Sequence, residues 1–473
     1  MAEVEPIIFG TDGWRGVIAE SFTFDNVRRV AAATASFFKE NPSSNPILIG
    51  YDRRFFSPEF ARCAAASFQA EGLKVLVSAG SLTTPALSVC VKARNAPWGI
   101  MITASHNPAV YNGFKVKDSY GRSAQPEVTR AIEQRLPPTA GSAEAAAFST
   151  FNAMPEYLRF LKSRLDLKSI LNFKGSVVFD YLHGTASGVP QALLKGSKFR
   201  MTGIHEAHDP LFGGLHPEPI EQNLSLLKQE IRLKRASIGL AFDGDGDRLG
   251  VVDDRGVYLT PHQVFPLLAL HALENRKLPG AIVQAVSLGY LGERIAQEFH
   301  RPFYEVPVGF KYIAERMIAE PVAAGGEESG GYALGGGLPE RDGILSGLFL
   351  LEMMAVTRKR ASELIAGMEK RFGRSRFKRV DIHLKNNIPS KEEFVKKVIS
   401  LLPDRVLGLT IKETRTFDGL KIILQNGWWV LLRPSGTEPL LRTYAETESN
   451  SKSKSLLAQA RMWANSATEG ELE

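Results

Sequence analysis

Cysteine is scarce in this sequence, with only Cys63 and Cys90 among 473 residues. Two cysteines cannot build a disulfide framework, and they cannot alone supply the four ligands of a structural zinc site. Long apolar runs are also missing, since no stretch reaches the ~18 residues that a membrane helix needs. The N-terminus begins with acidic residues rather than with a basic segment followed by an apolar one. These absences predict a cytoplasmic protein with no membrane partner.

A concentration of one charge sign is absent as well. The 58 Lys and Arg residues outnumber the 51 Asp and Glu residues, but the two kinds are interspersed along the chain. Without a basic stripe interleaved with aromatic residues, nucleic acid is not an expected partner. What is present is an ordinary globular composition, 44% apolar and 23% charged. A chain of this length exceeds one compact core, which predicts three or four domains.

Segments typical of strands and helices alternate along most of the chain, which predicts an α/β fold. The apolar runs expected to form strands are residues 47–51, 74–78, 98–103, 177–179, 238–242 and 281–286. A Pro- and Ala-rich stretch at residues 137–147 predicts a domain boundary near residue 150. The last part of the chain has a basic stretch at residues 371–379 and a strand candidate at 428–432, which favours a smaller α+β domain.

The strongest local pattern is the segment DGDGDR, which directly follows an apolar run. Asp243, Asp245 and Asp247 can surround a hard cation with oxygen ligands. Mg2+ fits best, because phosphate or water can complete its octahedron. A calcium EF-hand loop is excluded, since its Gly and Glu positions hold Arg248 and Asp254 here. A solvated acidic turn is the simpler alternative.

Ser105 lies in the polar segment TASHNP, again just past an apolar run. Reactive loops of α/β sheets are common at such strand ends, and we expect the serine side chain to be exposed there. Taken alone, the segment is also typical of an ordinary serine turn or a helix cap. Its assignment to a reaction therefore depends on whether the fold brings it to the DGDGDR segment.

Two further segments carry groups suited to phosphate and sugar. The segment RPSGTEP, with Arg442 after it, combines guanidinium, hydroxyl and glycine amide groups that suit a phosphate monoester. The glycine-rich residues 325–331 include Glu327 and Ser329, whose side chains can hydrogen-bond sugar hydroxyls. A plain turn and a flexible surface loop are the respective alternatives.

Read together and in this order, these segments resemble the α-D-phosphohexomutase superfamily, which contains phosphoglucomutases, phosphomannomutases and phosphoglucosamine mutases. Its N-terminal signature stands at residues 9–16 as FGTDGWRG, followed by TASHNP, DGDGDR, GEESGG and RPSGTEP. The resemblance covers nearly the whole chain. It implies three related α/β domains plus a smaller C-terminal α+β domain around a central cleft. The expected domains are residues 1–150, 151–254, 255–370 and 371–473.

The resemblance also implies roles for particular residues. Ser105 is the implied nucleophile and, with Asp243, Asp245 and Asp247, a ligand of Mg2+. Sugar recognition is implied for Glu327 and Ser329. The residues implied to hold the non-reacting phosphate are Arg433, Ser435, Gly436, Thr437 and Arg442. Those implied near the reactive phosphate are Arg15, His106, Lys115 and Arg248.

Lys115 is the candidate for proton transfer. That role requires a lowered pKa, because an ordinary lysine stays protonated near neutral pH. A cation that only neutralises phosphate is the alternative.

The implied reaction interconverts hexose 1-phosphate and hexose 6-phosphate. A phosphoserine gives its phosphoryl group to the sugar, and the resulting hexose 1,6-bisphosphate returns its other phosphate to the serine. The bisphosphate is thus also the expected activator. The expected partner is a small phosphosugar, and the chain is expected to be a monomer or a homodimer. A metal-dependent sugar phosphatase and a non-catalytic sugar-phosphate binder are alternatives from other classes.

Glucose is the expected sugar, because the segment PVGFK, with Lys311, resembles the phosphoglucomutase form of this region. The sugar loop departs from that pattern. Gly330 and Gly331 stand where glucose forms often have an aromatic residue and dual-specificity forms a His. Mannose phosphate, alone or together with glucose phosphate, is therefore the alternative substrate. Glucosamine phosphate is less favoured, because Gly246 is usually Ala in the members that use it.

Overall fold

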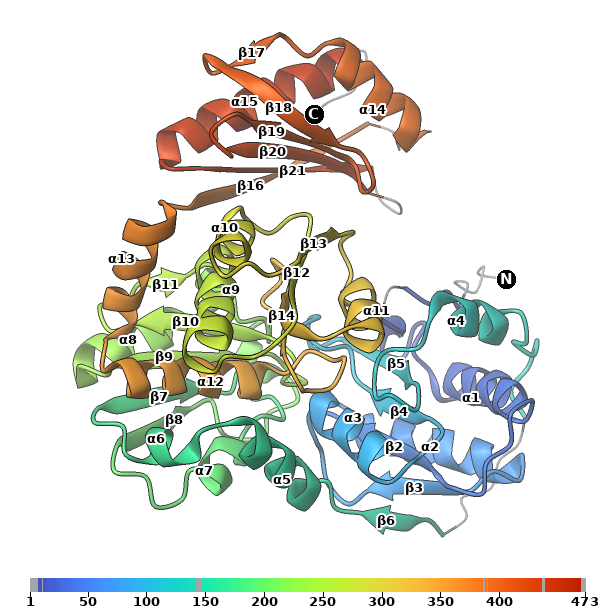
Figure 1. Ribbon diagram of the computed structural model, residues 1–473. Helices are drawn as coiled ribbons and strands as arrows, with labels where there is room; N and C mark the ends of the chain where they lie inside the picture. Colours follow the sequence, from blue (N-terminus) through green and yellow to red (C-terminus); the bar gives the residue numbers. More distant parts are fainter. Residues whose placement is uncertain are drawn as a thin grey trace.

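The computed structural model describes residues 7–10, 12–141, 147–385, 388, 390–435 and 439–468. Four sheets follow one another along the chain, each with its own helices (Figure 1). We call them units one to four. The expected architecture of three α/β units and a C-terminal α+β unit is confirmed. No helix in this described part of the chain is both long and apolar enough to cross a membrane.

The first unit is a six-stranded sheet in the order β1-β5-β4-β2-β3-β6. Its central strands are parallel and fully apolar, as in β2, where every residue is buried. Burial on both faces is typical of parallel strands covered by helices. Its elements are β1 (Trp14–Val17), α1 (Phe24–Phe38), β2 (Ile47–Tyr51), α2 (Ser57–Ala70), β3 (Val75–Ser78), α3 (Thr84–Ala93), β4 (Gly99–Ile102), β5 (Tyr111–Lys117), α4 (Pro126–Glu133) and β6 (Ser149–Phe151).

The second unit is a five-stranded sheet in the order β11-β10-β9-β7-β8. Strands β8, β7 and β9 are parallel, whereas β10 and β11 are antiparallel to their neighbours. Its main elements are α5 (Met154–Arg164), α6 (Leu167–Leu171), β7 (Ser176–Asp180), α7 (Val189–Leu193), β8 (Arg200–Ile204), α8 (Ser225–Lys234), β9 (Ile238–Phe242), β10 (Leu249–Asp253) and β11 (Tyr258–Leu259).

The third unit is a four-stranded sheet in the order β13-β12-β14-β15, of which only β15 is antiparallel. Its helix α12 is apolar all round and buried from Gly343 to Met354, because it packs between sheets. The elements are α9 (Pro261–Leu270), β12 (Ala281–Ala285), α10 (Leu291–Glu298), β13 (Phe303–Val306), α11 (Phe310–Ala319), β14 (Val322–Gly326), β15 (Tyr332–Leu334), α12 (Gly343–Thr357) and α13 (Ala361–Phe372).

The fourth unit is an antiparallel six-stranded sheet in the order β16-β21-β20-β19-β18-β17. Figure 1 shows it as a separate layer above α10. Its elements are β16 (Arg376–His383), α14 (Lys391–Ser400), β17 (Arg405–Val406), β18 (Leu409–Arg415), β19 (Leu420–Leu424), β20 (Trp429–Pro434), β21 (Leu440–Thr447) and α15 (Asn450–Ala467).

One kind of connection recurs in all four units: each motif segment joins two neighbouring antiparallel strands. TASHNP connects β4 to β5, DGDGDR connects β9 to β10, GEESGG connects β14 to β15, and RPSGTEP connects β20 to β21. In the first three units the preceding strand is also part of the parallel sheet. The motif thus begins at the carboxyl end of a parallel strand, where α/β folds usually place their sites.

The sheets extend slightly beyond the expected domain boundaries. Strand β6 spans residue 150, and β11 pairs with β10 of the second unit although it lies after residue 254. Helix α12 contacts β9 and β10 of the second unit as well as β15 of the third. Strand pairing and shared burial thus cross the borders, and the division at residues 150, 254 and 370 stays a prediction.

Candidate active site

The β4–β5 and β9–β10 hairpins meet and bring Ser105 to the aspartate loop. Ser105 Oγ donates a hydrogen bond of 2.9 Å to Asp243 Oδ2. This close approach requires Gly244, because a Cβ there would lie 2.5 Å from the Ser105 carbonyl oxygen. Ser105 is only 1% exposed, so the expectation of an exposed serine is wrong, since the second hairpin covers it. Its backbone φ of 53° is a left-handed conformation that is uncommon outside glycine.

The three aspartates of the loop form a candidate metal centre. One possible ligand oxygen from each lies within 4.8 Å of the others, and all three residues are buried. Asp245 Oδ2 accepts hydrogen bonds from Thr84 Oγ1 at 2.6 Å and Lys115 Nζ at 3.0 Å, and Asp247 Oδ2 accepts one from Arg341 at 2.6 Å. The Oδ1 atoms of both aspartates have no hydrogen-bond partner. Buried carboxylate oxygens left in this way fit a hard divalent cation.

The electrostatics of the three aspartates agree with this fit. Burial raises the pKa of Asp243 well above its usual range, and the charges of Asp247 and Asp245 raise it further. For Asp245, burial also acts to raise the pKa, but the charge of Lys115 and the hydrogen bonds from Thr84, Lys115 and Asp243 together outweigh it, and the net shift is downward. The ionised form of Asp243 is therefore disfavoured in these surroundings, and a bound cation would favour it.

Lys115 lies beneath the aspartate loop, with Nζ 2.8 Å from Asp12 Oδ2 and 3.0 Å from Asp245 Oδ2. Burial alone would lower the pKa of Lys115. The charges of Asp12, Asp245 and Asp247 outweigh burial and raise that pKa above its usual value. A proton acceptor needs a lowered pKa, so these surroundings favour the alternative role of a fixed positive charge over proton transfer.

Asp12 and Arg341 complete this network, and the sequence analysis missed both. Arg341 Nη2 donates to Asp12 Oδ2 at 2.9 Å and to Asp247 Oδ2 at 2.6 Å. Asp12 belongs to the N-terminal signature FGTDGWRG, which could have identified it. Arg341 lies far along the chain, before α12, with no local motif that marks it. Its partner residues come from two other units, and only the fold brings them together.

Arg15, His106 and Arg248 lie beside this centre. Arg15 donates a hydrogen bond to the side chain of Asn107 in the serine loop. Arg248 Nη1 donates to Glu218 Oε1 at 2.8 Å, and its Nη2 lies 3.4 Å from His106 Nε2. Burial lowers the pKa of His106 well below its usual value, and the charges of Arg248 and Arg15 lower it further. The imidazole is therefore neutral near neutral pH.

A buried ion pair between Asp52 and Arg54 supports the serine loop from behind. The Arg54 guanidinium donates hydrogen bonds of 2.6 to 3.0 Å to the carbonyl oxygens of Ser105, Asn107, Pro108 and Tyr111. Asp52 Oδ2 accepts from Thr103 Oγ1 at 2.6 Å, and Thr103 Oγ1 in turn accepts from the Ser105 amide at 2.9 Å. These bonds determine the backbone path around the serine. The sequence analysis missed the pair, although it directly follows the apolar run of β2.

A cleft of about 1160 Å³ opens beside these hairpins. The expected site residues that line it are His106, Arg248, Ser329, Arg433 and Arg442. They come from all four units, so the motif loops do converge on one cavity. Lys378 and Arg379 of β16 add positive charge to its wall. The cleft is therefore suited to an anion with more than one negative group.

The remaining expected sugar-binding residues lie off the cleft wall. Glu327 is 4% exposed, and its Oε1 accepts a hydrogen bond of 2.9 Å from the Gly309 amide. Burial raises the pKa of Glu327 to about 7 despite nearby Arg341. The adjacent Glu328 lines the cleft instead. The sugar-binding role implied for Glu327 stays a prediction, and Glu328 is a further acid at the same loop that the sequence did not single out.

Lys311, Ser435, Gly436 and Thr437 complete the expected set. Lys311 lies on α11 with its ammonium 4.9 Å from the centre of the Tyr312 ring, and it does not line the cleft. The Ser435 amide donates to the Leu440 carbonyl at 2.8 Å, closing the β20–β21 hairpin. Gly436 and Thr437 lie outside the described residues.

Comparisons with known proteins agree with this architecture. The four phosphoglucomutase/phosphomannomutase domains match the chain in order: α/β/α domain I at residues 6–140, domain II at 155–256, domain III at 260–372 and the C-terminal domain at 376–461. A phosphoglucomutase/phosphomannomutase of Thermococcus kodakarensis is 28% identical, covering 95% of this chain and 96% of its own length. A phosphoglucosamine mutase of Caldanaerobacter subterraneus is 29% identical, covering 94% and 96%.

A solved structure is similar over almost the full length. The crystal structure of a Thermus thermophilus protein that carries the name phosphomannomutase is 35% identical, with a TM-score of 0.86, covering 97% of this chain and 99% of that one. Both the ordered domain matches and this full-length similarity agree with the motif resemblance. The chain therefore belongs to the α-D-phosphohexomutase superfamily of mutase enzymes.

Proposed function

We propose that this protein interconverts hexose 1-phosphate and hexose 6-phosphate through a phosphorylated Ser105. The observation that carries the proposal is the cleft beside the Ser105 and aspartate hairpins, which is also lined by the sugar loop and by Arg433 and Arg442. Arginines on different units, Arg248 on the second and Arg433 on the fourth, suit a molecule with two phosphate groups. A hexose 1,6-bisphosphate that turns over within the cleft is such a molecule.

The side chains near Ser105 have distinct roles in this reaction. The P–O bond of the phosphoserine breaks as a sugar hydroxyl bonds to phosphorus, so the hydroxyl loses a proton and Ser105 Oγ regains one. Arg15 and Arg248 would hold the phosphoryl oxygens, and Lys115 would offset their charge. His106, held neutral on the cleft wall, can exchange hydrogen bonds with the same group. Such a reaction depends mainly on positioning and charge stabilisation.

Asp243, Asp245 and Asp247 would hold Mg2+ together with an oxygen of the phosphoserine. When bound, the ion supplies positive charge against the transferring phosphoryl group. Thr84, Lys115 and Arg341 bind the Oδ2 atoms of Asp245 and Asp247, and thereby orient the Oδ1 atoms toward a common centre. The chain's own hydrogen bonds thus leave one oxygen of Asp245 and one of Asp247 available to the metal.

Glucose phosphate is the substrate we propose, on the basis of Lys311 and the PVGFK segment. Glucosamine phosphate is a second candidate, because several relatives of 28 to 29% identity carry the name phosphoglucosamine mutase, among them the Caldanaerobacter subterraneus protein. Turnover of glucose, mannose and glucosamine 1-phosphates should be compared at equal concentration with a trace of the matching bisphosphate. A preference for glucosamine or mannose phosphate would contradict the glucose assignment and leave the mutase assignment intact.

The serine chemistry has its own test. Incubation with glucose 1,6-bisphosphate should add one phosphoryl group, which peptide mapping should locate at Ser105. Ser105→Ala should lose both the added mass and mutase turnover. Ser187→Ala is the matched control and should keep both, since its hydroxyl bonds only the Glu206 carbonyl away from the cleft. Full activity of Ser105→Ala would overturn the proposal, and stoichiometric release of inorganic phosphate would indicate a phosphatase instead.

A further inference from the structure

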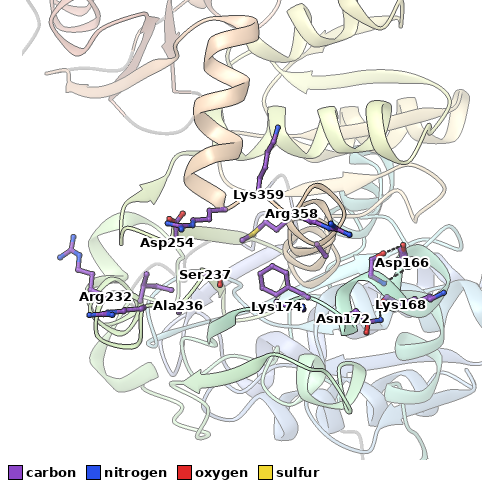
Figure 2. A pocket seen from close by; sticks show the side chains of 17 residues that line it. Asp166, Lys168, Asn172, Lys174, Arg232, Ala236, Ser237, Asp254, Arg358 and Lys359 are labelled. Carbon is purple, nitrogen blue, oxygen red and sulfur yellow. Dashed lines mark hydrogen bonds between the residues drawn. The ribbon is translucent and has the colours of Figure 1, made fainter.

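A second cavity, of about 1220 Å³, lies where the second unit packs against α12 and α13, and shares no lining residue with the cleft. Figure 2 shows its walls. They come from α6 and the turn after it, from the C-terminal end of α8, and from the turn between α12 and α13. The proposed mutase reaction uses none of these segments.

The walls of this cavity are strongly basic. Seven of the lining residues are Lys or Arg and two are Asp. Both aspartates are already bound within the fold. Asp166 accepts hydrogen bonds from the amide and hydroxyl of Ser169, and Asp254 accepts them from the amide and hydroxyl of Ser362. Most of the positive charge on the walls is therefore not balanced by the chain itself.

Five of the cations have no side-chain hydrogen bond or ion pair to any residue within the described ranges. They are Lys168, Lys174, Arg235, Arg358 and Lys359. Elsewhere on α8 the pattern is different, because Lys228 pairs with Glu221 at 2.8 Å and Lys234 with Glu230 at 2.6 Å. Unpaired cations are thus concentrated at the cavity, while their neighbours on the same helix have acidic partners.

Two of these arginines occupy unusual backbone positions. Arg235 follows α8 with φ of 49°, and Arg358 follows α12 with φ of 56°. Glycine is favoured at this position because a Cβ is strained there. Cations at helix C-termini are favourable, but this does not account for Arg360, which is the N-cap residue of α13, where a cation is unfavourable. Helix ends alone therefore do not explain the cluster.

The cavity also has an apolar floor. Ile231, Ala236 and Met354 pack beneath it with almost no exposed surface, so the aromatic ring of Phe173, partly exposed on the wall, is the apolar group that a ligand can contact. A small inorganic anion would use the cations and leave the Phe173 ring uncovered and most of the volume empty. The lining therefore suits a larger anion that carries a ring.

We propose that this cavity binds a nucleoside polyphosphate, with its phosphates against Lys174, Arg358 and their neighbours and its base against Phe173. Several phosphate oxygens can replace water as hydrogen-bond acceptors for the exposed cations that the chain leaves unpaired. The site lies at the opposite end of α12 from Arg341, which binds the aspartate loop. No residue that lines this second site takes part in the proposed mutase reaction.

Binding of ATP to the full chain should be measured by calorimetry, with hydrogen exchange to locate it. We expect protection at residues 168–174 and 354–360, and weaker binding as salt rises. Lys174→Gln/Arg358→Gln should weaken ATP binding by at least about tenfold, because charge-assisted hydrogen bonds are lost. Lys195→Gln/Arg200→Gln is the matched control, since it removes two exposed cations of the second unit that lie outside the cavity, and it should bind ATP normally.

Three other probes separate the alternatives. Tripolyphosphate should bind more weakly than ATP, and equal affinity would overturn the nucleoside assignment. Adenosine alone should bind far more weakly than ATP.

Glucose 1,6-bisphosphate should bind the two double variants equally, because its site is the cleft. Loss of its binding in Lys174→Gln/Arg358→Gln would overturn the proposal in favour of a second phosphosugar site. Unchanged ATP binding in that variant would overturn it altogether. Mutase turnover without nucleotide reports the proposed function separately.

Discussion

Arg54 is the side chain on which the shape of the serine loop most depends. Arg54→Lys keeps the charge beside Asp52 but cannot reach four carbonyl groups at once. We expect the rate of hexose phosphate turnover to fall roughly 10- to 100-fold, with a smaller change in KM, because the loop binds substrate less than it positions Ser105. Steady-state kinetics and the phosphorylated fraction of Ser105 after bisphosphate treatment measure this.

Arg53→Lys provides the control for that change. Arg53 is the neighbouring residue, and its guanidinium donates only to the Glu206 carbonyl. The same chemical substitution there should leave kinetics unchanged. If both variants behave alike, or if Arg54→Lys loses turnover only because it unfolds, the positioning role is refuted. Thermal unfolding of each variant distinguishes these outcomes.

Asp243 accepts a hydrogen bond from Ser105 and belongs to the proposed metal site, and burial together with the charges of Asp247 and Asp245 disfavours its ionised form. Asp243→Asn should relieve that repulsion, so the Tm of the metal-free protein should stay the same or rise. Added Mg2+ should raise the Tm of the wild type by binding the folded state, and this increase should be lost in the variant. Calorimetry with and without EDTA checks both. A Tm increase of equal size in the variant would contradict a metal site that includes Asp243.

Motif residues were predictable because their chemistry is visible in a short segment. Ser105 and the three aspartates follow apolar runs that end abruptly, and each segment contains the groups that its proposed role requires. Asp12, Arg54 and Arg341 act through partners tens to hundreds of residues away. No local pattern contains that information. Which of Glu327 and Glu328 lines the cleft depends on the direction of the β14–β15 hairpin, and residue types alone do not determine that direction.

At the scale of single elements, the start of α12 gives a pH prediction. Its N-cap Asp342 accepts hydrogen bonds from the Leu345 amide at 2.8 Å and the Tyr157 hydroxyl at 2.9 Å. Burial raises the pKa of Asp342 to about 7. In the unfolded chain its carboxyl ionises near pH ~4. Between these two pH values the Asp342 carboxyl is protonated in the folded state but ionised in the unfolded chain. The stability that this bound proton contributes is therefore lost as pH rises.

Asp342→Asn keeps an accepting oxygen but has no proton to lose. The free energy of unfolding of the variant minus that of wild type should therefore increase by roughly 1 to 3 kcal/mol as the pH rises from about 5 to about 8. Denaturant unfolding at both pH values measures the difference. Asp342→Ala should be less stable than Asp342→Asn at either pH, by ~1 kcal/mol, because the cap is lost. A pH-independent difference between Asp342→Asn and wild type would refute the assignment.

The strands themselves were largely predictable. The run at residues 47–51 is β2 and the run at 238–242 is β9, because fully buried parallel strands consist of continuous apolar residues. Pairing was not predictable in the same way. Whether β10 turns back beside β9 or continues to another sheet depends on contacts with α12 and with the first unit, which no single segment specifies.

At the scale of the whole molecule, the fourth unit contributes cations to a cleft built by the other three. Asp418 accepts hydrogen bonds from Arg433 Nε at 2.9 Å and from the Val308 amide at 2.8 Å, which joins the fourth unit to the third. Arg433→Gln should raise the KM for hexose phosphate about 10-fold or more through a lost charge-assisted contact, with a smaller effect on kcat. Steady-state kinetics measure both parameters.

Lys412→Gln serves as the control for Arg433→Gln. Lys412 is an exposed cation on β18 of the same unit and does not line the cleft. It should leave KM unchanged. A KM for Arg433→Gln equal to that of wild type would show that the fourth unit does not hold the substrate phosphate. The convergence that this experiment tests is the part of the site that depends entirely on tertiary structure.

Helix α12 has a consequence for how distant parts of the molecule communicate. It starts directly after the cap residue that follows Arg341 and ends just before Arg358, so one helix of 15 residues, ~22 Å long, extends from the side of the aspartate loop to the basic cavity. If an occupant of one end changes the affinity at the other by some factor, thermodynamic reciprocity demands the same factor in return. Bound sugar phosphate would then change the affinity for nucleotide by the same factor by which bound nucleotide changes the affinity for sugar phosphate.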